Sequence, residues 1–246
     1  MKKSLGQNFF VNKNLSKQIA EIVLKEDPSL IVEIGPGLGA FTQFFTEKNI
    51  EILAIEKDND LSLKLKNLYP SVTIKNIDFL DWDFHGLESF KKKKITFFGS
   101  LPYNVSKKII KKIITSEFFN SSSFLIIQKE VAEKYCSKEP NNNFLSLSTA
   151  LYADTNKLFN ISPESFKPRP NVESTFIQFT PKTVLLKNAE DFEKFLHTAF
   201  RQPKKTLKNN FAKSYLFTNE EILPLLQKRP QHLSLEQYLY LFNNVV

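Results

Sequence analysis

Residues 30–40 decide the fold of this chain, and they read Leu30-Ile31-Val32-Glu33-Ile34-Gly35-Pro36-Gly37-Leu38-Gly39-Ala40. Three of the six glycines in the 246 residues fall within five positions here, directly after an apolar run. Glycine has no Cβ, so a glycine-rich turn between a strand and a helix lets backbone N–H groups approach a nucleotide-like ligand closely. The stretch therefore predicts a ligand site at Gly35 and Gly37.

Outward from this turn, short apolar runs alternate with amphipathic stretches between residue 15 and about residue 130. This alternation predicts βα units around a largely parallel sheet, an α/β fold. Strands are expected at Leu30–Ile34, Glu51–Ile55, Val72–Ile77, Ile95–Phe98 and Phe124–Gln128, with a later strand within Val172–Phe179. The segment Lys107–Ile114 sets four lysines opposite four isoleucines, which predicts a helix with one side on the sheet and a basic outer side.

The pattern changes towards the C-terminus. Residues 160–181 are rich in proline, and beyond about residue 185 apolar residues recur at helical spacing without a strand pattern. We therefore predict a ligand-binding domain over residues 1–184 and a small α-helical domain over residues 185–246.

Composition narrows the class of protein. No apolar stretch reaches the roughly 18 residues that a membrane span requires, and the N-terminus does not resemble a signal peptide. The single cysteine, Cys136, excludes an internal disulfide, and the three histidines lack metal-ligand spacing, so we expect a cytoplasmic protein without a metal site. The net charge of +8 fits either a polyanionic partner such as nucleic acid or a solvated basic surface.

An acidic residue follows the second expected strand. Glu56 lies 21 residues after Gly35, where a carboxylate accepts hydrogen bonds from a ribose diol. Gly35-x-Gly37-x-x-Ala40 also satisfies the dinucleotide fingerprint. Both an oxidoreductase that binds NAD and an enzyme with another adenosine-containing cofactor fit these residues.

The ends of the next two strands favour the second possibility. Asp78 is placed to accept a hydrogen bond from an adenine amino group, and Phe79 to pack against the ring. After the fourth strand, Gly99-Ser100-Leu101-Pro102-Tyr103-Asn104 fits methyl transfer to an exocyclic amine. The amine nitrogen becomes nucleophilic when acceptors hold its hydrogens, and we assign this role to the hydroxyl of Ser100 and the carbonyl of Leu101 or Pro102. Tyr103 is placed to stack on the base.

These segments together resemble one family, the bacterial small-subunit ribosomal RNA adenine dimethyltransferases. The resemblance spans almost the whole chain and includes further short motifs. They are Leu5-Gly6-Gln7-Asn8-Phe9, Gln128-Lys129-Glu130-Val131-Ala132, Phe166-x-Pro168-x-Pro170-x-Val172-x-Ser174, and Ala199-Phe200 with Lys204-Lys205-Thr206-Leu207-Lys208-Asn209.

The resemblance implies a Rossmann-like methyltransferase fold and S-adenosylmethionine as cofactor. The cofactor contacts that it implies are Asn8, Phe10, Gly35, Glu56, Asp78 and Ser100. The implied substrate is a pair of adjacent adenosines in a hairpin loop near the 3′ end of small-subunit rRNA, within the 30S particle. Tyr103 and Phe166 are implied to sandwich each adenine, and the protein is implied to be a monomer. Lys91–Lys94, Lys107–Lys112 and Lys204–Lys208 are candidates for phosphate contact.

The chain departs from the family pattern at three places. Ser100 replaces the usual asparagine, Phe10 replaces leucine, and Pro203-Lys204-Lys205 replaces an arginine pair. A serine hydroxyl still accepts a hydrogen bond, but it reaches less far and brings no amide donor. Ser100 therefore keeps open a ribosome-assembly factor that has lost methyl transfer, beside the oxidoreductase. A relative that modifies a single large-subunit rRNA adenine is a further alternative, and the C-terminal signature argues against it.

Overall fold

The computed structural model describes residues 8–48, 50–183, 186 and 188–245. The chain divides into two compact units, one of Met1–Ala132 with Thr155–Pro181 and the other of Glu133–Asp154 with Lys182–Val246. The expected boundary between residues 184 and 185 lies outside the described residues, as do Leu5, Gly6 and Gln7 of the first family motif. The assignment of domains 1–184 and 185–246 stays a prediction.

The first unit is built around a sheet whose described strands lie in the order β4-β3-β2-β5-β6-β9-β7. Their bounds are β2 (Leu30–Ile34), β3 (Glu51–Ile55), β4 (Thr73–Lys75), β5 (Ile95–Ser100), β6 (Ser123–Gln128), β7 (Ala153–Ile161) and β9 (Ser174–Pro181). Neighbours from β4 to β6 run parallel, and β9 runs antiparallel to β6. Because β2 lies between β3 and β5, the strand order reverses there, and such a switch point is where open α/β sheets bind ligands.

The predicted strands are confirmed in position, with differences at their ends. β2 and β3 coincide with the expected ranges, β5 continues to Ser100, and the strand expected at Val72–Ile77 shortens to Thr73–Lys75. β7 was not predicted. Its sequence has apolar residues without strict alternation, and most of its side chains are only partly buried or exposed, as suits the last strand of a sheet.

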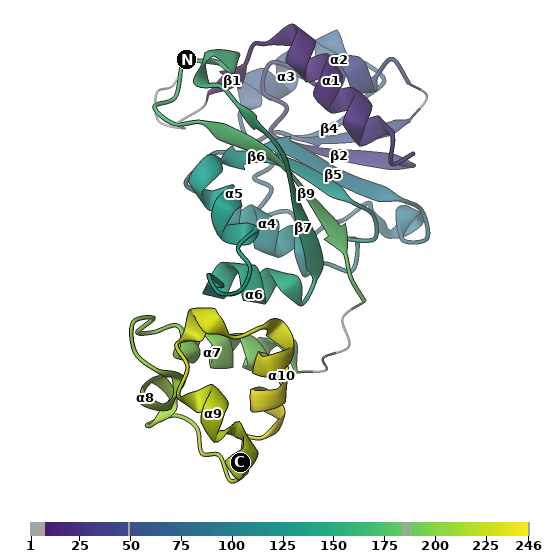
Figure 1. Ribbon diagram of the computed structural model, residues 1–246. Coiled ribbons are helices and arrows are strands. Elements are labelled where there is room, and N and C mark those ends of the chain that lie inside the picture. Colours follow the sequence, from purple (N-terminus) through teal and green to yellow (C-terminus); the bar gives the residue numbers. More distant parts are fainter. Residues whose placement is uncertain (1–7, 49, 184–185, 187, 246) are drawn as a thin grey trace. The chain divides into compact units, whose positions relative to one another are not determined.

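Helices cover both faces of this sheet (Figure 1). α1 (Lys13–Leu24), α2 (Thr42–Phe45) and α3 (Asn59–Leu68) lie on one face, and α4 (Ser106–Ile114) lies on the other. The predicted helix at Lys107–Ile114 is confirmed, because α4 buries its four isoleucines, Ile109, Ile110, Ile113 and Ile114. α5 (Lys129–Tyr135) follows β6 directly.

A short second sheet joins the N-terminus to a distant loop. β1 (Phe9–Phe10) pairs antiparallel with β8 (Phe166–Lys167), and Phe10 lies opposite Phe166 in the register. The ring of Phe10 packs 5.1 Å from that of Phe166 and 4.8 Å from that of Phe41, centroid to centroid. All three rings belong to the core between the sheet and α1 and α2. This pairing brings Asn8 and Phe166 to the same region.

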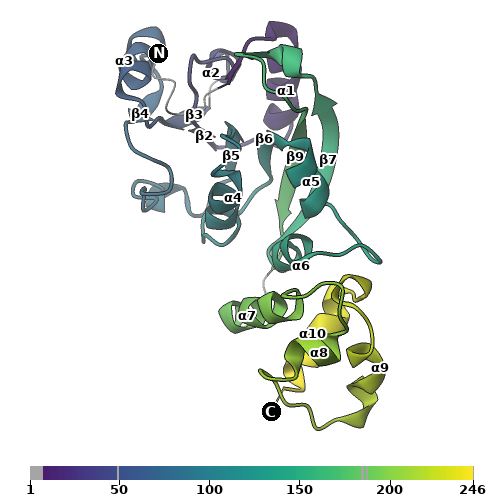
Figure 2. The same cartoon turned by 90° about the vertical axis from the view of Figure 1, so that its left-hand side faces the viewer.

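The second unit is helical, as predicted for the C-terminal part. Figure 2 shows α7 to α10 gathered into one group. Its helices are α6 (Phe144–Ala150), α7 (Ala189–Ala199), α8 (Leu207–Phe211), α9 (Leu223–Leu226) and α10 (Leu235–Asn243). Phe192, Phe195 and Tyr238 are fully buried at its centre. Residues 133–154 group with this unit because Leu147 and Leu151 pack into the same core. None of the helices described is long and apolar enough to cross a membrane.

Candidate functional site

A pocket lies at the carboxyl ends of the parallel strands in the first unit, at the switch point. It brings together all of the site residues predicted from the sequence: Asn8, Phe10, Gly35, Gly37, Glu56, Asp78, Phe79, Ser100, Leu101, Pro102, Tyr103 and Phe166. The roles of these residues stay predictions. The grouping follows from topology, since parallel neighbours end at one edge of the sheet.

The glycine turn after β2 forms one wall of the pocket. Gly35 and Gly37 have φ values of +63° and +60°, in the left-handed region that favours glycine. A Cβ on Gly37 would lie 3.2 Å from Cδ1 of Phe9. A Cβ on Gly35 would meet no atom of the described residues within 4 Å, so this backbone borders open pocket space. The turn thus allows a ligand to approach the main chain closely.

Glu56, directly after β3, connects the glycine turn after β2 to the loop after β3. Only 3% of its surface is exposed. One carboxylate oxygen, Oε2, accepts a hydrogen bond from the Gly37 N–H at 3.1 Å, and Oε1 accepts one from the Asp58 N–H at 2.8 Å. Burial raises the pKa of Glu56, and the two N–H donors oppose that rise. The carboxylate therefore fixes the loops after β2 and β3 and keeps lone pairs for ligand hydroxyls.

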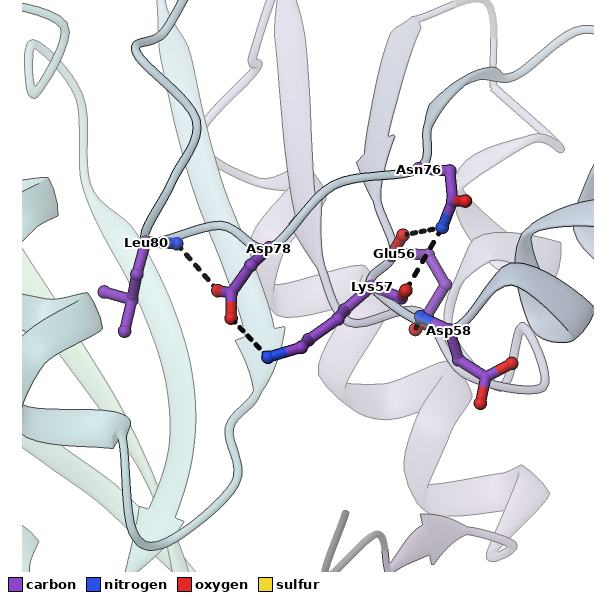
Figure 3. Close-up of polar contacts among 6 residues, drawn as sticks. All are labelled: Glu56, Lys57, Asp58, Asn76, Asp78 and Leu80. Carbon is purple, nitrogen blue, oxygen red and sulfur yellow. Dashed lines mark hydrogen bonds and ion pairs between the residues drawn. The ribbon is translucent and has the colours of Figure 1, made fainter. Parts of the chain in front are cut away.

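Asp78 lies in the loop after β4, beside Lys57 (Figure 3). Its Oδ1 accepts a hydrogen bond from the Leu80 N–H at 2.9 Å, and its Oδ2 lies 2.7 Å from Nζ of Lys57. Partial burial favours the protonated acid, but the hydrogen bonds from Lys57 and Leu80 outweigh it and lower the pKa of Asp78. Sequence reasoning missed Lys57. Its position directly after Glu56 was the one sequence feature that could have placed it at the site.

Phe79 forms a buried wall beside Asp78, and Lys112 of α4 supports it. The Nζ of Lys112 donates to the Leu80 carbonyl at 2.7 Å and to the Trp82 carbonyl, and it lies 5.7 Å from the centroid of the Phe79 ring. Desolvation lowers the pKa of Lys112. Lys112 thus fixes the loop after β4, whereas Lys107 and Lys108 on the same helix are exposed and keep the predicted basic surface.

The loop after β5 carries the groups predicted to act on an amine. A Cβ on Gly99 would lie 2.8 Å from the Ile34 carbonyl oxygen, so only glycine fits between β5 and β2. Ser100 ends β5 at the pocket. The Pro102 carbonyl accepts hydrogen bonds from the N–H groups of Val105 and Ser106, which use both of its lone pairs. Of the two carbonyls proposed as amine acceptors, that of Leu101 is therefore favoured.

Two aromatic side chains border the same end of the pocket. The Tyr103 hydroxyl lies 3.0 Å from Oγ of Ser174, a hydrogen bond that restricts the ring. Phe166 is only 5% exposed, and its ring stands nearly perpendicular to that of Phe10. Phe166 also lines the pocket, and its contact with Phe10 restricts the orientation of its ring.

Glu33, inside β2, is a buried acid that sequence reasoning left without a role. Its Oε2 accepts a hydrogen bond from the Thr42 hydroxyl at 2.7 Å, while its buried Oε1 has no partner among the described residues. Burial raises the pKa of Glu33 to about 7. The sequence did carry a signal for this buried acid, since glutamate is rare within a strand whose five residues are all buried. Among the described residues, no group of His, Cys, Asp and Glu side chains is arranged to hold a metal ion.

Comparisons with known proteins identify the family of this chain. Residues 1–244 match the family model for ribosomal RNA adenine dimethylase. The chain is 33% identical to a Ribosomal RNA small subunit methyltransferase A of Chlorobium phaeobacteroides over 248 residues, which cover 100% of this chain and 94% of that protein. It is 35% identical to the protein of the same name from Francisella tularensis over 216 residues, with coverage of 85% and 82%.

Solved structures confirm the predicted fold class. A dimethyladenosine transferase from Plasmodium falciparum superimposes with a TM-score of 0.81 at 21% identity, covering 96% of this chain and 97% of that one. The 23S rRNA methyltransferase ErmE superimposes with a TM-score of 0.76 at 19% identity, covering 97% and 99%. The first unit is therefore a Rossmann-like methyltransferase fold.

Proposed function

This chain belongs to the ribosomal RNA adenine dimethylase family, and from this premise we propose that it dimethylates the N6 amines of two adjacent adenosines near the 3′ end of small-subunit rRNA. It is an S-adenosylmethionine-dependent methyltransferase, and the family assignment disfavours an NAD-dependent oxidoreductase and a non-catalytic assembly factor. The observation that carries the proposal is the row of pocket residues along the ends of four adjacent strands.

The donors and acceptors in this row fit S-adenosylmethionine. In sheet order, Asp78 follows β4, Glu56 follows β3, the Gly35 turn follows β2 and Ser100 ends β5. We infer that Asp78 accepts from the adenine amino group, that Glu56 accepts from the ribose hydroxyls, and that the turn adjoins the methionine end. The reacting end of the pocket is then at Ser100.

Catalysis at Ser100 depends on positioning. S-adenosylmethionine supplies a methyl group on a cationic sulfur. The Ser100 hydroxyl and the Leu101 carbonyl hold the two hydrogens of the adenine amine, so its lone pair turns out of conjugation with the ring. Tyr103 holds the base by stacking, with its hydroxyl fixed on Ser174. No general base is required, because the methylated amine is cationic and loses its proton to water readily.

We further propose that the substrate is a hairpin loop in the 30S particle. Unpaired bases stack on aromatic side chains at small cost, which suits a pocket bordered by Tyr103 and Phe166. Exposed lysines in the helical unit, Lys204, Lys205 and Lys208, provide phosphate contacts with less directional preference than arginines. An enzyme with this substrate acts in the cytoplasm, and we infer that it acts as a monomer.

The direct test is to incubate the purified protein with S-adenosylmethionine and unmethylated small ribosomal subunits, then digest the rRNA and map methylated adenosines by mass spectrometry. We expect N6,N6-dimethyladenosine at two adjacent positions of the 3′-end hairpin. Subunit binding without this product would contradict methyl transfer and identify a non-catalytic assembly factor. Methylated adenosine only at other positions of this rRNA would contradict the proposed substrate.

Ser100 can be tested in the same assay. Ser100→Ala is expected to reduce the rate of methylation about 3- to 10-fold, the range that corresponds to loss of one hydrogen bond of about 0.5–1.5 kcal/mol. Ser100→Asn, which restores the usual family residue, is the matched control and should retain or increase the rate. If Ser100→Ala methylates as fast as the wild type, the Ser100 hydroxyl is not an acceptor for the amine.

A further inference from the structure

The side chain of Lys57 reaches Asp78 at the proposed cofactor site (Figure 3). Lys57 follows Glu56 at the end of β3 and lines the same pocket as Asp78 and Phe79. Its Nζ contacts Oδ2 of Asp78 at 2.7 Å. The ammonium group of Lys57 thus forms an ion pair with the carboxylate that is proposed to bind the adenine amino group.

The other oxygen of Asp78 is also engaged. Oδ1 accepts a hydrogen bond from the Leu80 N–H at 2.9 Å, a local contact that fixes the carboxylate within its loop. Because the Leu80 bond fixes Oδ1 within the loop, an incoming amino group approaches Oδ2 most readily, where the ammonium of Lys57 already lies. The backbone contact of Oδ1 does not need to change.

The backbone of Lys57 is fixed, whereas its side chain is free to move into solvent. The Asn76 amide donates to the Glu56 carbonyl at 2.8 Å and to the Lys57 carbonyl at 3.2 Å, which joins the loops after β3 and β4. The Lys57 side chain is 60% exposed, so the ammonium remains hydrated when it leaves the carboxylate. Exchange of Lys57 for a ligand donor therefore needs no movement of the main chain.

Asp78 keeps a second nearby cation after such an exchange. The charge of Lys112 also favours the ionised form of Asp78, and Lys112 is held by the Leu80 and Trp82 carbonyls. The carboxylate thus stays charged, and so it stays a strong acceptor for an adenine amino group.

From this arrangement we propose that Lys57 competes with the adenine of the cofactor for Asp78, so that cofactor binding exchanges an ion pair for a hydrogen bond. The inference rests on the proposed cofactor site. Lys57 lowers the affinity for the cofactor and makes it depend on ionic strength. Because exposed ion pairs contribute little, the expected effect is about 2- to 5-fold in the dissociation constant.

The test is calorimetric titration of the full-length protein with S-adenosylhomocysteine. Lys57→Met removes the charge and keeps an unbranched stem, and it is expected to lower the dissociation constant about 2- to 5-fold at low salt. Higher salt screens the ion pair in the wild type, so the two proteins should converge at 0.5 M NaCl. Lys66→Met, an equal charge change at an exposed position of α3, is the control and should bind as the wild type does.

Asp78→Asn completes a double-mutant cycle. If Lys57 acts through Asp78, adding Lys57→Met to Asp78→Asn should leave the dissociation constant unchanged within about 1.5-fold. Equal or weaker binding by Lys57→Met alone would overturn the competition. Failure of the wild type to bind S-adenosylhomocysteine would instead contradict the proposed cofactor site, so the two failures are distinguishable.

Discussion

Glu56→Gln is expected to weaken cofactor binding by roughly 5- to 150-fold, although the two side chains have nearly the same size. Each oxygen of the Glu56 carboxylate accepts a backbone N–H, from Gly37 at 3.1 Å and from Asp58 at 2.8 Å. An amide offers one acceptor oxygen, and its NH₂ group would face the second N–H. One of the two loops must therefore lose its hydrogen bond inside a buried site.

The size of this effect follows from the cost of an unpaired buried donor, about 1–3 kcal/mol, or roughly 5- to 150-fold in affinity when ligand binding must restore the loop. Titration with S-adenosylhomocysteine measures it. Glu51→Gln is the matched control, because Glu51 begins the same strand but is exposed. A Glu56→Gln dissociation constant within twofold of the wild-type value would show that the carboxylate does not organise the cofactor site.

Glu33→Gln is expected to change the pH dependence of stability by roughly 2.5 kcal/mol between pH 5 and pH 8. Burial raises the pKa of Glu33 from 4.5 to about 7, the hydrogen bond from Thr42 opposes the rise, and the charge of Glu56 adds to it. Burial raises the pKa of the nearby Tyr69, and the charge of Glu33 adds to that rise. The folded protein thus holds a proton on Glu33 that the unfolded chain releases near pH 4.5.

The sign of the effect follows from this difference in bound protons. Between pH 4.5 and about 7 the folded state binds more protons, so the free energy of unfolding falls as the pH rises through this interval. Glutamine does not ionise, and the variant should gain stability relative to the wild type on going from pH 5 to pH 8. Urea unfolding at both pH values measures this gain, with Glu51→Gln as control. A constant difference between Glu33→Gln and wild type would mean that Glu33 does not titrate in this range.

Local sequence signals predicted the central part of the fold. β2 and β3 coincide with the expected ranges because apolar runs and the glycine turn are encoded in consecutive residues. The positions of Glu56 and Asp78 after successive strands predicted that they line one ligand site, because parallel neighbours end at one edge of a sheet. The α4 helix followed from the spacing of its isoleucines.

Pairings between distant segments were not predictable in this way. β1 and β8 are strands of two residues each, and they form only because Phe9–Phe10 meets Phe166–Lys167, more than 150 residues later. Short strands have no periodicity of their own. The direction in which a long side chain points could not be predicted either. Lys112 belongs to a lysine-rich helix face, but its ammonium donates to the Leu80 and Trp82 carbonyls.

The sequence by itself determined the α/β class, the glycine turn and the row of polar residues at the strand ends, because periodicity and backbone conformation depend on near neighbours in the chain. Only the tertiary structure decided that Lys57 pairs with Asp78, that one buried oxygen of Glu33 has no partner among the described residues, and that Phe166 packs on Phe10. Burial and ion pairing arise from groups brought together across the fold, and they set the charges and acceptors that the pocket presents to its ligand.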